Sequence, residues 1–254
     1  MIKITIVTVC RNSAATIRDT LESIASQSHK NFEHIIIDGG STDGTLAVIH
    51  EWKKHRVHLV SEPDNGIYDA MNKGIRLATG DVIGILNSDD VYYDSHILEN
   101  VSAVMSNPAI DACYADLIYV DKDNIKNIIR YWKSCAFKKG LFSKGWMPPH
   151  PTFFARRRVY ENYGLFDLNY ALAADVELLA RFLERFQIQA VYIPRIFIRM
   201  RLGGISNNSV VNIIRQNFWI YKAFKKNNVP LSPVSFLIVK ISSRIKQFCA
   251  RPTI

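Results

Sequence analysis

The chain has 254 residues, enough for one large α/β domain with a full core or for one domain plus a small appendage, and its 48% hydrophobic and 22% charged residues are ordinary for a globular protein. No apolar run reaches the roughly 18 residues of a membrane-spanning helix, and the first residues lead directly into a strand-like alternation. We therefore expect neither a membrane span nor a signal peptide. The four cysteines have no metal-ligand spacing, which suggests a reducing compartment.

The formal net charge of +9 is distributed unevenly along the chain. All 23 acidic residues lie at or before Glu184, whereas 12 of the 32 Lys and Arg follow it. The C-terminal quarter is therefore strongly basic. This asymmetry predicts an anionic partner for that part of the chain, either a membrane surface or a nucleic acid.

The first half of the chain alternates strand and helix patterns. Strands are expected at residues 3–9, 32–38, 57–61 and 81–86, and helices at 14–27, from about 45 to 53, and at 67–78. This βαβαβαβ order predicts an α/β fold, Rossmann-like, with a mostly parallel sheet and helices on both faces.

The second half is less regular. A hairpin is expected from residues 112–120 and 127–132, then a loop to 151, a strand at 152–155, helices at 156–163 and 174–186, and strands around 188–200. Two helices, 211–227 and 232–248, should end the chain. The last of these places apolar residues at helical spacing with Lys240, Arg244 and Lys246 off the stripe. It is either an interfacial membrane helix or a helix packed back on the domain.

Acidic residues follow three successive strands of the expected parallel sheet. Asp38 ends the second strand, Asp64 follows the third, and residues 87–90 (Asn-Ser-Asp-Asp) follow the apolar run 82–86. Open α/β sheets bind their ligands at this edge. A Mg²⁺ or Mn²⁺ ion holding a diphosphate would offset the repulsion between Asp89 and Asp90. A helix N-cap is the alternative interpretation of these four residues.

The segment 38–45 couples an acid to glycines and to a helix N-terminus, which favours anions. It contains neither the GxGxxG motif of dinucleotide-binding proteins nor the GxxxxGK(S/T) motif of the P-loop. Together with residues 8–12, 61–74 and 87–90, it occurs in the order seen in family 2 inverting glycosyltransferases. Over residues 3–205 the chain resembles the small, non-processive bacterial members that build exopolysaccharide or O-antigen units, the colanic-acid type most of all. The resemblance implies the GT-A fold, a nucleotide-sugar donor, and Mg²⁺ or Mn²⁺.

Carried over position by position, the resemblance implies that six residues bind the nucleotide sugar: Thr8, Arg11, Asp38, Asp64, Asn72 and Asp89. Asp38 would contact the base and Asp89 the ribose or the sugar, while Asp90 would bind the metal that bridges the diphosphate. Met71 stands where many relatives have arginine, so the identity of the base stays open.

An inverting transfer needs a general base for the acceptor hydroxyl. The family takes it from a Glu-Asp pair at a helix start, where this chain has Ala174 and Asp175, so the resemblance implies Asp175 as the catalytic base. A plain first-turn acid is the alternative, with Asp167 and Glu177 as substitutes. His150 lies between prolines in the loop that the family uses near the acceptor, where it would contact the acceptor or only fill the turn.

These patterns predict a GT-A catalytic domain at residues 1–205, with a nucleotide-sugar half (1–110) and an acceptor half (111–205), and a basic helical C-terminal extension at 206–254. The expected reaction moves one sugar from a UDP-, GDP- or dTDP-linked donor to a polyprenyl-diphosphate-linked saccharide. It would take place in the cytoplasm, at the inner-membrane surface, where anionic lipids attract the basic extension.

Two other functions share parts of this pattern. A sugar-phosphate nucleotidyltransferase shares the sheet and the metal chemistry, but typically carries a glycine-rich loop near residues 8–18, which this chain lacks. A nucleic-acid-binding protein would use the basic extension, but the strand-end acids would repel phosphates and no recognition motif occurs. We expect no nucleic-acid partner.

Overall fold

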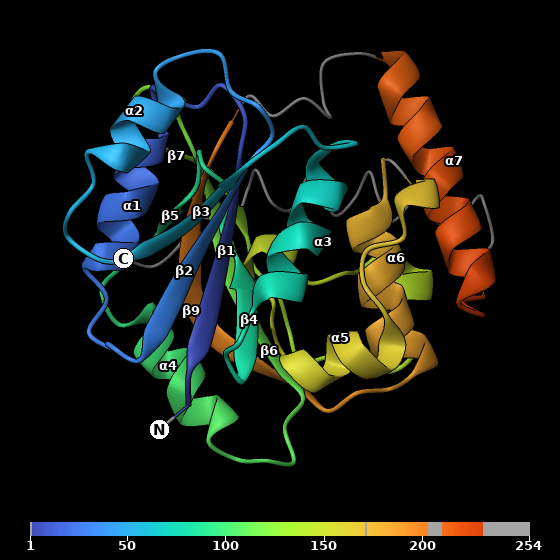
Figure 1. The fold of residues 1–254 in the computed structure, drawn as a ribbon. Coiled ribbons are helices and arrows are strands. Elements are labelled where there is room, and N and C mark those ends of the chain that lie inside the picture. The colour runs from blue at the N-terminus through green and yellow to red at the C-terminus, as the bar shows by residue number, and fades with distance from the viewer. Residues whose placement is uncertain (1, 171, 203–209, 231–254) are drawn as a thin grey trace.

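The computed structural model describes residues 2–170, 172–202 and 210–230 (Figure 1). Its first half consists of three strand–helix units and a fourth strand: β1 (Ile4–Cys10), α1 (Ile17–Ala25), β2 (Phe32–Asp38), α2 (Thr45–His50), β3 (Val57–Ser61), α3 (Ile67–Leu77) and β4 (Val82–Ile85). β1 pairs in parallel with both β2 and β4, and β2 pairs in parallel with β3. The predicted alternation is confirmed, and β2 and β3 have the predicted bounds.

The second half contributes β5 (Val91–Tyr92), α4 (Ile97–Met105), β6 (Ala112–Val120), β7 (Ile128–Trp132), β8 (Phe154–Arg156), α5 (Arg157–Tyr163), α6 (Ala174–Ala180), β9 (Ala190–Arg201) and α7 (Val210–Lys226). Short turns of 3₁₀ helix form at η1 (Phe142–Lys144), η2 (His150–Thr152) and η3 (Leu168–Tyr170), and a π-helical turn, η4 (Arg181–Arg185), continues α6. The predicted β6–β7 hairpin is present.

All strands of the described residues belong to one sheet in the order β3-β2-β1-β4-β8-β6-β9-β5, and β7 pairs with residues 117–120 of β6, beyond the short contact of β6 with β8. β8 runs antiparallel to both β4 and β6, while β9 runs parallel to β6. The sheet is therefore parallel in its first half and mixed in its second. All four parallel strands of the first half end at the same edge, which is where the acidic loops lie.

Helices cover both faces of the sheet (Figure 1). On one face α3, α5 and α6 pack on the inner strands, and α7 adds Ile220 and Phe224 to that layer. On the other face α1, α2 and α4 form two smaller clusters. All seven residues of β1 are buried, as expected for a central strand with both faces covered. At the β4–β8 contact, Gly84 leaves room for the Phe154 ring, which would lie 2.2 Å from an added Cβ.

The helix expected at residues 211–227 corresponds to α7, which packs on α6 and on the turns beside it through aromatic pairs such as Phe142–Phe224 and Tyr170–Trp219. The helix expected at 232–248 lies outside the described residues. Within the described part of the chain, no helix is both long and apolar enough to cross a membrane.

Candidate functional site

The loop after β2 is organised by the carboxylate of Asp38. This fully buried side chain accepts hydrogen bonds at Oδ2 from the backbone N–H groups of Gly40 (3.2 Å) and Ser41 (3.0 Å) and from the hydroxyl of Ser61 (2.8 Å). Burial alone would raise the pKa of Asp38, but the hydrogen bonds from Ser41 and Ser61 lower it below its ordinary value. Asp38 is thus held ionised and shapes the first turn of its own loop.

The loop after β3 approaches the loop after β2 at a glycine. A Cβ atom added to Gly39 would lie 2.2 Å from Oδ2 of Asp64. Only a glycine therefore allows the carboxylate of Asp64 to approach the β2 loop this closely. Oδ1 of Asp64 accepts a hydrogen bond from the N–H of Gly66 at 2.8 Å. The carboxylates of Asp38 and Asp64 therefore belong to two loops in direct contact.

The loop after β1 joins both the β2 loop and the acidic turn after β4. Asn12 has a left-handed backbone (φ 52°), donates its N–H to Ser41 Oγ (2.8 Å) and accepts the N–H of Thr42 at its Oδ1 (2.8 Å). The hydroxyl of Ser13 lies 2.8 Å from that of Ser88. Arg11 is exposed between these contacts. The predicted residues Arg11, Asp38 and Asp64 and the turn at 87–90 are thus brought to one edge of the sheet.

Thr8 takes part in a buried chain of hydrogen bonds. Its Oγ1 lies 2.9 Å from Nε2 of His34, whose Nδ1 lies 2.9 Å from Nε2 of His55. The indole N–H of Trp52 donates to Nδ1 of His55 (3.1 Å). Since the indole of Trp52 can only donate, each member of this series donates a hydrogen bond to the next, from Trp52 to Thr8. Burial lowers the pKa of His55 to about 4, and burial together with His55 lowers the pKa of His34 well below its ordinary value, so both rings are neutral at pH 7.

The turn after β4 carries two adjacent acids in different environments. Asp90 is fully buried and accepts a hydrogen bond at Oδ2 from Asn87 (3.2 Å), whereas Asp89 is half-buried. Burial and the neighbouring Asp89 raise the pKa of Asp90 well above its ordinary value, and burial also raises the pKa of Asp89. Arg201 of β9 supports the turn by donating to the backbone carbonyl of Asp89 (2.7 Å) and by pairing with Asp19.

Two oxygen atoms of this turn are buried and have no hydrogen-bond donor among the described residues, Oδ1 of Asp90 and Oδ1 of Asn87. Orphaned acceptors next to a second carboxylate fit a bound cation. No group of three or more His, Cys, Asp and Glu that could hold a metal ion occurs in the described segments. The orphaned oxygens of Asp90 and Asn87 are hard ligands of the kind that Mg²⁺ and Mn²⁺ prefer, and these ions commonly add phosphate oxygens and water.

Asp175, at the start of α6, meets two side chains from distant parts of the sequence. Its Oδ1 accepts the hydroxyl of Tyr68 (3.1 Å), and its Oδ2 lies 3.3 Å from Nδ1 of His150. Burial and the charge of Asp175 raise the pKa of Tyr68 well above its ordinary value, so Tyr68 stays a proton donor. His150 and Asp175 line a small pocket whose other walls are apolar apart from the Tyr160 hydroxyl: Met71, Ile85, Phe153, Tyr160, Phe166, Leu178 and Leu179.

The other candidate acids and Asn72 have structural partners. Glu177 is fully buried between Arg181 (2.9 Å) and Lys226 (3.1 Å) and so holds α7 on α6, while Asp167 also binds Lys226 (2.7 Å) and holds α7 on the segment before η3. The amide of Asn72 donates to and accepts from the backbone of Phe166, at 2.9 Å in each direction. Of the three acids considered for the base, Asp175 alone lines the pocket.

Residues 5–164 match the family model described as Glycosyl transferase family 2. The chain belongs to glycosyltransferase family 2. This glycosyltransferase is 30% identical over 203 residues to a PGL/p-HBAD biosynthesis glycosyltransferase of Mycobacterium bovis (strain BCG / Pasteur 1173P2), a match that covers 78% of this chain and 77% of the relative. It is 24% identical over 245 residues to the putative glycosyltransferase EpsE of Bacillus subtilis (strain 168), covering 92% and 86% of the two chains.

Solved structures with the same architecture confirm the predicted GT-A fold. The mannosyltransferase PcManGT from Pyrobaculum calidifontis, in complex with GDP-Man and Mn²⁺, superposes with a TM-score of 0.65 at 20% identity, covering 95% of this chain and 69% of that one. S. aureus TarS 1-349 in complex with UDP gives a TM-score of 0.63 at 15% identity, covering 98% and 72%. The family and the fold favour sugar transfer over the nucleotidyltransferase and nucleic-acid-binding alternatives.

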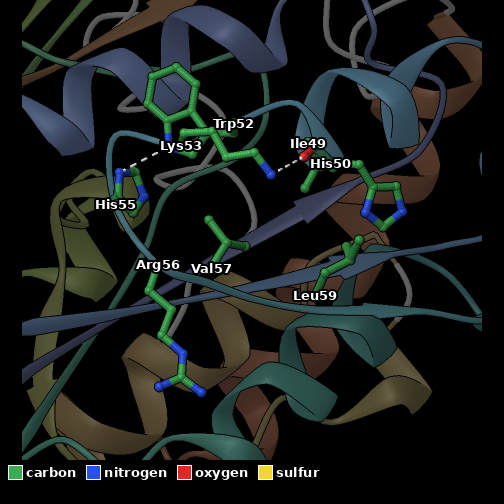
Figure 2. A pocket seen from close by; sticks show the side chains of 8 residues that line it. All are labelled: Ile49, His50, Trp52, Lys53, His55, Arg56, Val57 and Leu59. Atoms are coloured by element: carbon green, nitrogen blue, oxygen red, sulfur yellow. Dashed lines mark hydrogen bonds between the residues drawn. The ribbon is translucent and has the colours of Figure 1, made fainter.

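The glycosyltransferase has a second hollow, at the outer edge of the sheet between α2 and β3 (Figure 2). In this view Trp52 donates to His55, and Lys53 binds the backbone oxygen of His50 (3.1 Å). None of the residues predicted from the sequence lines this hollow. Its walls include Trp52 and His55, the outer members of the series of hydrogen bonds that ends at Thr8. Of the predicted residues, Arg11, Asp38, Asp64, Asp89 and Asp90 lie instead at the carboxyl ends of β1 to β4 or in the loops that follow them.

The sequence did not single out Tyr68 or Arg201 as functional residues. Tyr68 lies inside the motif at residues 61–74, but its partner Asp175 is 107 positions away. Arg201 is 112 positions from Asp89. In the sequence, nothing distinguishes Tyr68 or Arg201 from other polar residues, and no short-range spacing links Tyr68 to Asp175 or Arg201 to Asp89. The fold alone brings them together.

Proposed function

We propose that this glycosyltransferase moves a single sugar, with inversion, from a nucleoside-diphosphate donor to a lipid-linked saccharide acceptor. One observation carries the proposal. Ile85, the last residue of β4, lines the pocket of His150 and Asp175, and the acidic turn begins two residues later at Asn87. This short separation supports the proposal, because a single displacement requires the proposed diphosphate site and the proposed proton-acceptor site to be neighbours.

For the donor, we propose that the nucleoside lies over the contact between the β2 and β3 loops, along Asp38 and Asp64, with Arg11 exposed beside it. Thr8 and Asn72, whose polar atoms bind His34 and Phe166, would support this surface from below. The solved neighbours with GDP-Man and UDP support a nucleotide-sugar donor. Which of a UDP-, GDP- or dTDP-linked sugar is used depends on the base contacts of the loops.

For the metal, we propose that the turn at residues 87–90 holds Mg²⁺ or Mn²⁺. Asp90 would offer its orphaned Oδ1, and Asp89, which is closer to solvent, would contact the ribose or the sugar and share the charge. A bound cation would stabilise the negative charge that develops on the diphosphate as the bond to the sugar breaks. The neighbour that contains Mn²⁺ supports this assignment.

For the acceptor, we propose that its hydroxyl enters the small pocket of His150 and Asp175, and that this pair of side chains accounts for the loss of its proton. The hydroxyl oxygen then attacks the anomeric carbon from the face opposite the diphosphate, so the configuration inverts. The pocket has a volume of about 20 Å³, which suits a single hydroxyl group, and its mostly apolar walls leave few polar groups to compete for the proton.

We further propose that the acceptor is a polyprenyl-diphosphate-linked saccharide for a surface polysaccharide, met at the cytoplasmic face of the inner membrane. Helix α7 contains no acidic residue and exposes Phe218 (53%) and Tyr221 (43%) beside Lys222. Exposed aromatic rings among cations suit an anionic lipid interface. In this scheme residues 1–205 are the catalytic domain and 206–254 the membrane-directed extension.

A donor screen tests the proposal. UDP-glucose, UDP-GlcNAc, GDP-mannose and dTDP-rhamnose are each offered with Mn²⁺ and a membrane extract, and released nucleoside diphosphate is measured. We expect release with one donor, loss of release with EDTA or in Asp90→Asn, and wild-type release in the exposed-acid control Asp123→Asn. NMR of the product should show the inverted anomeric configuration. No release above the enzyme-free blank with any donor would contradict the proposed function.

A further inference from the structure

Both carboxylate oxygens of Asp175 face another side chain. Oδ1 accepts the Tyr68 hydroxyl at 3.1 Å, and Oδ2 lies 3.3 Å from Nδ1 of His150. A proton from the acceptor could reach Asp175 only at an oxygen that already has one of these partners. The imidazole, by contrast, turns Nδ1 toward Asp175 and leaves Nε2 for another partner.

We propose that His150 is the group that takes the acceptor proton, through Nε2, and that Asp175 is a positioning residue that orients the ring. This assignment rests on the sugar transfer proposed above and names the atom at which its proton arrives. Asp175 would fix the proton on Nδ1 and would stabilise the positive ring that forms. Tyr68 would in turn hold the carboxylate in place.

Exposure favours the same order of roles. The His150 side chain is 29% exposed and that of Asp175 is 14% exposed, so the ring is the more accessible of these two polar groups. Asp175 lies behind it, between the ring and Tyr68, whose own ring stacks on Phe166. A distance of 3.3 Å suits a catalytic pair without substrate, since such contacts tighten when the complex forms.

The backbone around His150 is built to hold the ring in one place. His150 opens the 3₁₀ turn η2 between Pro149 and Pro151, and its carbonyl accepts the N–H of Phe153 (3.1 Å). Thr152 anchors this turn to β6, because its hydroxyl binds both the N–H (3.1 Å) and the carbonyl (3.0 Å) of Ala115. The two prolines and Thr152 therefore hold the backbone of His150 in a fixed position, which restricts where the imidazole ring can lie.

The step balances without any further reactant. The acceptor O–H bond breaks and its proton moves to Nε2 of His150, while the oxygen forms a bond to the anomeric carbon. The bond from that carbon to the nucleoside diphosphate breaks, and its electron pair leaves with the diphosphate. The imidazolium then returns its proton to water after the product departs. A positioned base of this kind contributes about 10²- to 10⁴-fold in rate.

Chemical rescue separates His150 from Asp175 as the proton acceptor. With the donor that the wild type uses and Mn²⁺ present, we expect His150→Ala to lower kcat by about 100-fold or more, with the donor KM within about threefold. Added imidazole should restore part of this rate. The exposed-histidine control His58→Ala should keep the wild-type rate. A His150→Ala enzyme within about threefold of the wild-type kcat would overturn the assignment, as would rescue of Asp175→Ala, but not of His150→Ala, by formate or azide.

A second measurement needs no donor. ¹⁵N NMR of the free enzyme should find the neutral His150 ring with its proton on Nδ1, and Asp175→Asn should shift it toward the Nε2–H form. An Nε2–H ring in the wild type contradicts the role. The two proposals fail separately: a wild type that turns over no donor overturns the sugar transfer and this role together, whereas an active wild type with a normal His150→Ala variant overturns this role alone.

Discussion

The carboxylate of Asp64 lies against the backbone of Gly39, so that a Cβ atom on Gly39 would come within 2.2 Å of Oδ2 and 3.1 Å of Cγ. We predict that Gly39→Ala displaces this carboxylate and parts the two loops proposed to cradle the nucleoside. Nucleoside diphosphate binding should weaken roughly tenfold, which corresponds to about 1.4 kcal/mol. The dissociation constant is measured by calorimetric titration of the variant with the nucleoside diphosphate that the wild type releases from its donor.

Gly44→Ala is the matched control for this prediction. Gly44 precedes α2 in the same loop, and an added Cβ would meet Cβ of Ala14 at 3.7 Å, which is an ordinary contact. We expect nearly unchanged binding. Equal losses in the two variants would show that the close approach of Asp64 to Gly39 is not what matters.

The Trp52–His55–His34–Thr8 chain predicts a loss of stability in mild acid. Both histidines have a pKa below the value of the unfolded chain, His55 at about 4, so the unfolded state binds more protons than the folded state below about pH 6.5. Their contribution is complete above that pH and is lost as the pH falls toward 4. Between pH 7 and 5 the free energy of unfolding should drop by on the order of 1–2 kcal/mol from His55.

Urea unfolding at both pH values measures this effect. The matched variant is His55→Gln, because the amide can accept from Trp52 and donate to His34 but has no proton to gain in this range. Its pH dependence should be flatter than that of the wild type. If the free energy of unfolding of the variant falls with pH as steeply as that of the wild type, the two histidines do not cause the loss of stability in acid.

The buried carboxylate of Glu177 predicts a large effect on stability. It neutralises Arg181 and Lys226 at once, at 2.9 and 3.1 Å, and also accepts from the amide of Asn227 (3.2 Å). Glu177→Gln keeps the shape but leaves two cations facing an amide. Removing one partner of a buried ion pair costs about 3–5 kcal/mol, and we expect a loss near the lower end because Lys226 also has Asp167.

Glu161→Gln provides the surface comparison. Glu161 pairs with Arg157 at 2.8 Å, with both side chains about half exposed. Such pairs contribute roughly 0–1 kcal/mol. Chemical denaturation of the two variants side by side should therefore separate them clearly. If Glu177→Gln unfolds like Glu161→Gln, the attachment of α7 to α6 depends on its aromatic contacts instead.

The exposed aromatic side chains of α7 predict binding to anionic lipid. Sedimentation with vesicles that contain phosphatidylglycerol should carry down the wild type, and Phe218→Ser/Tyr221→Ser should bind roughly tenfold more weakly, since each ring contributes buried apolar area at the interface. Leu77→Ser removes an apolar side chain of similar exposure, 40%, from α3 and should change nothing. Equal binding by all three proteins would place the lipid contact outside this face.

The regular parts of the fold follow from short-range patterns. β2 and β3 are apolar runs that end in polar loop residues, and both occur with the predicted bounds. The helix predicted at 174–186 is α6 followed by the π-helical turn η4, which periodicity alone does not distinguish. No element was predicted at residues 91–105, where β5 and α4 lie. β5 has two residues and exists through its pairing with Arg199 and Ile198, about a hundred positions away.

The candidate site divides in the same way. The strand-end acids could be predicted because parallel strands place their carboxyl ends at one edge. His150 and Asp175 were each singled out, but their approach depends on how η2 packs on α6, which no spacing encodes. Asn72 shows the opposite case: its motif suggested a ligand contact, and the packing of α3 gives both ends of its amide to the backbone of Phe166.

The place of β8 in the sheet has a consequence for how the chain is made. β8 lies between β4 and β6, although it follows both in the sequence, and β5 at the far edge pairs only with β9. During synthesis the parallel half therefore waits with an open strand edge until residue 156 has emerged, and β5 waits until β9 is complete. We expect a fragment that ends near residue 110 to aggregate through β4, because unpaired strand edges recruit other chains. The β4 edge beside the candidate site is therefore closed only after most of the chain has been made.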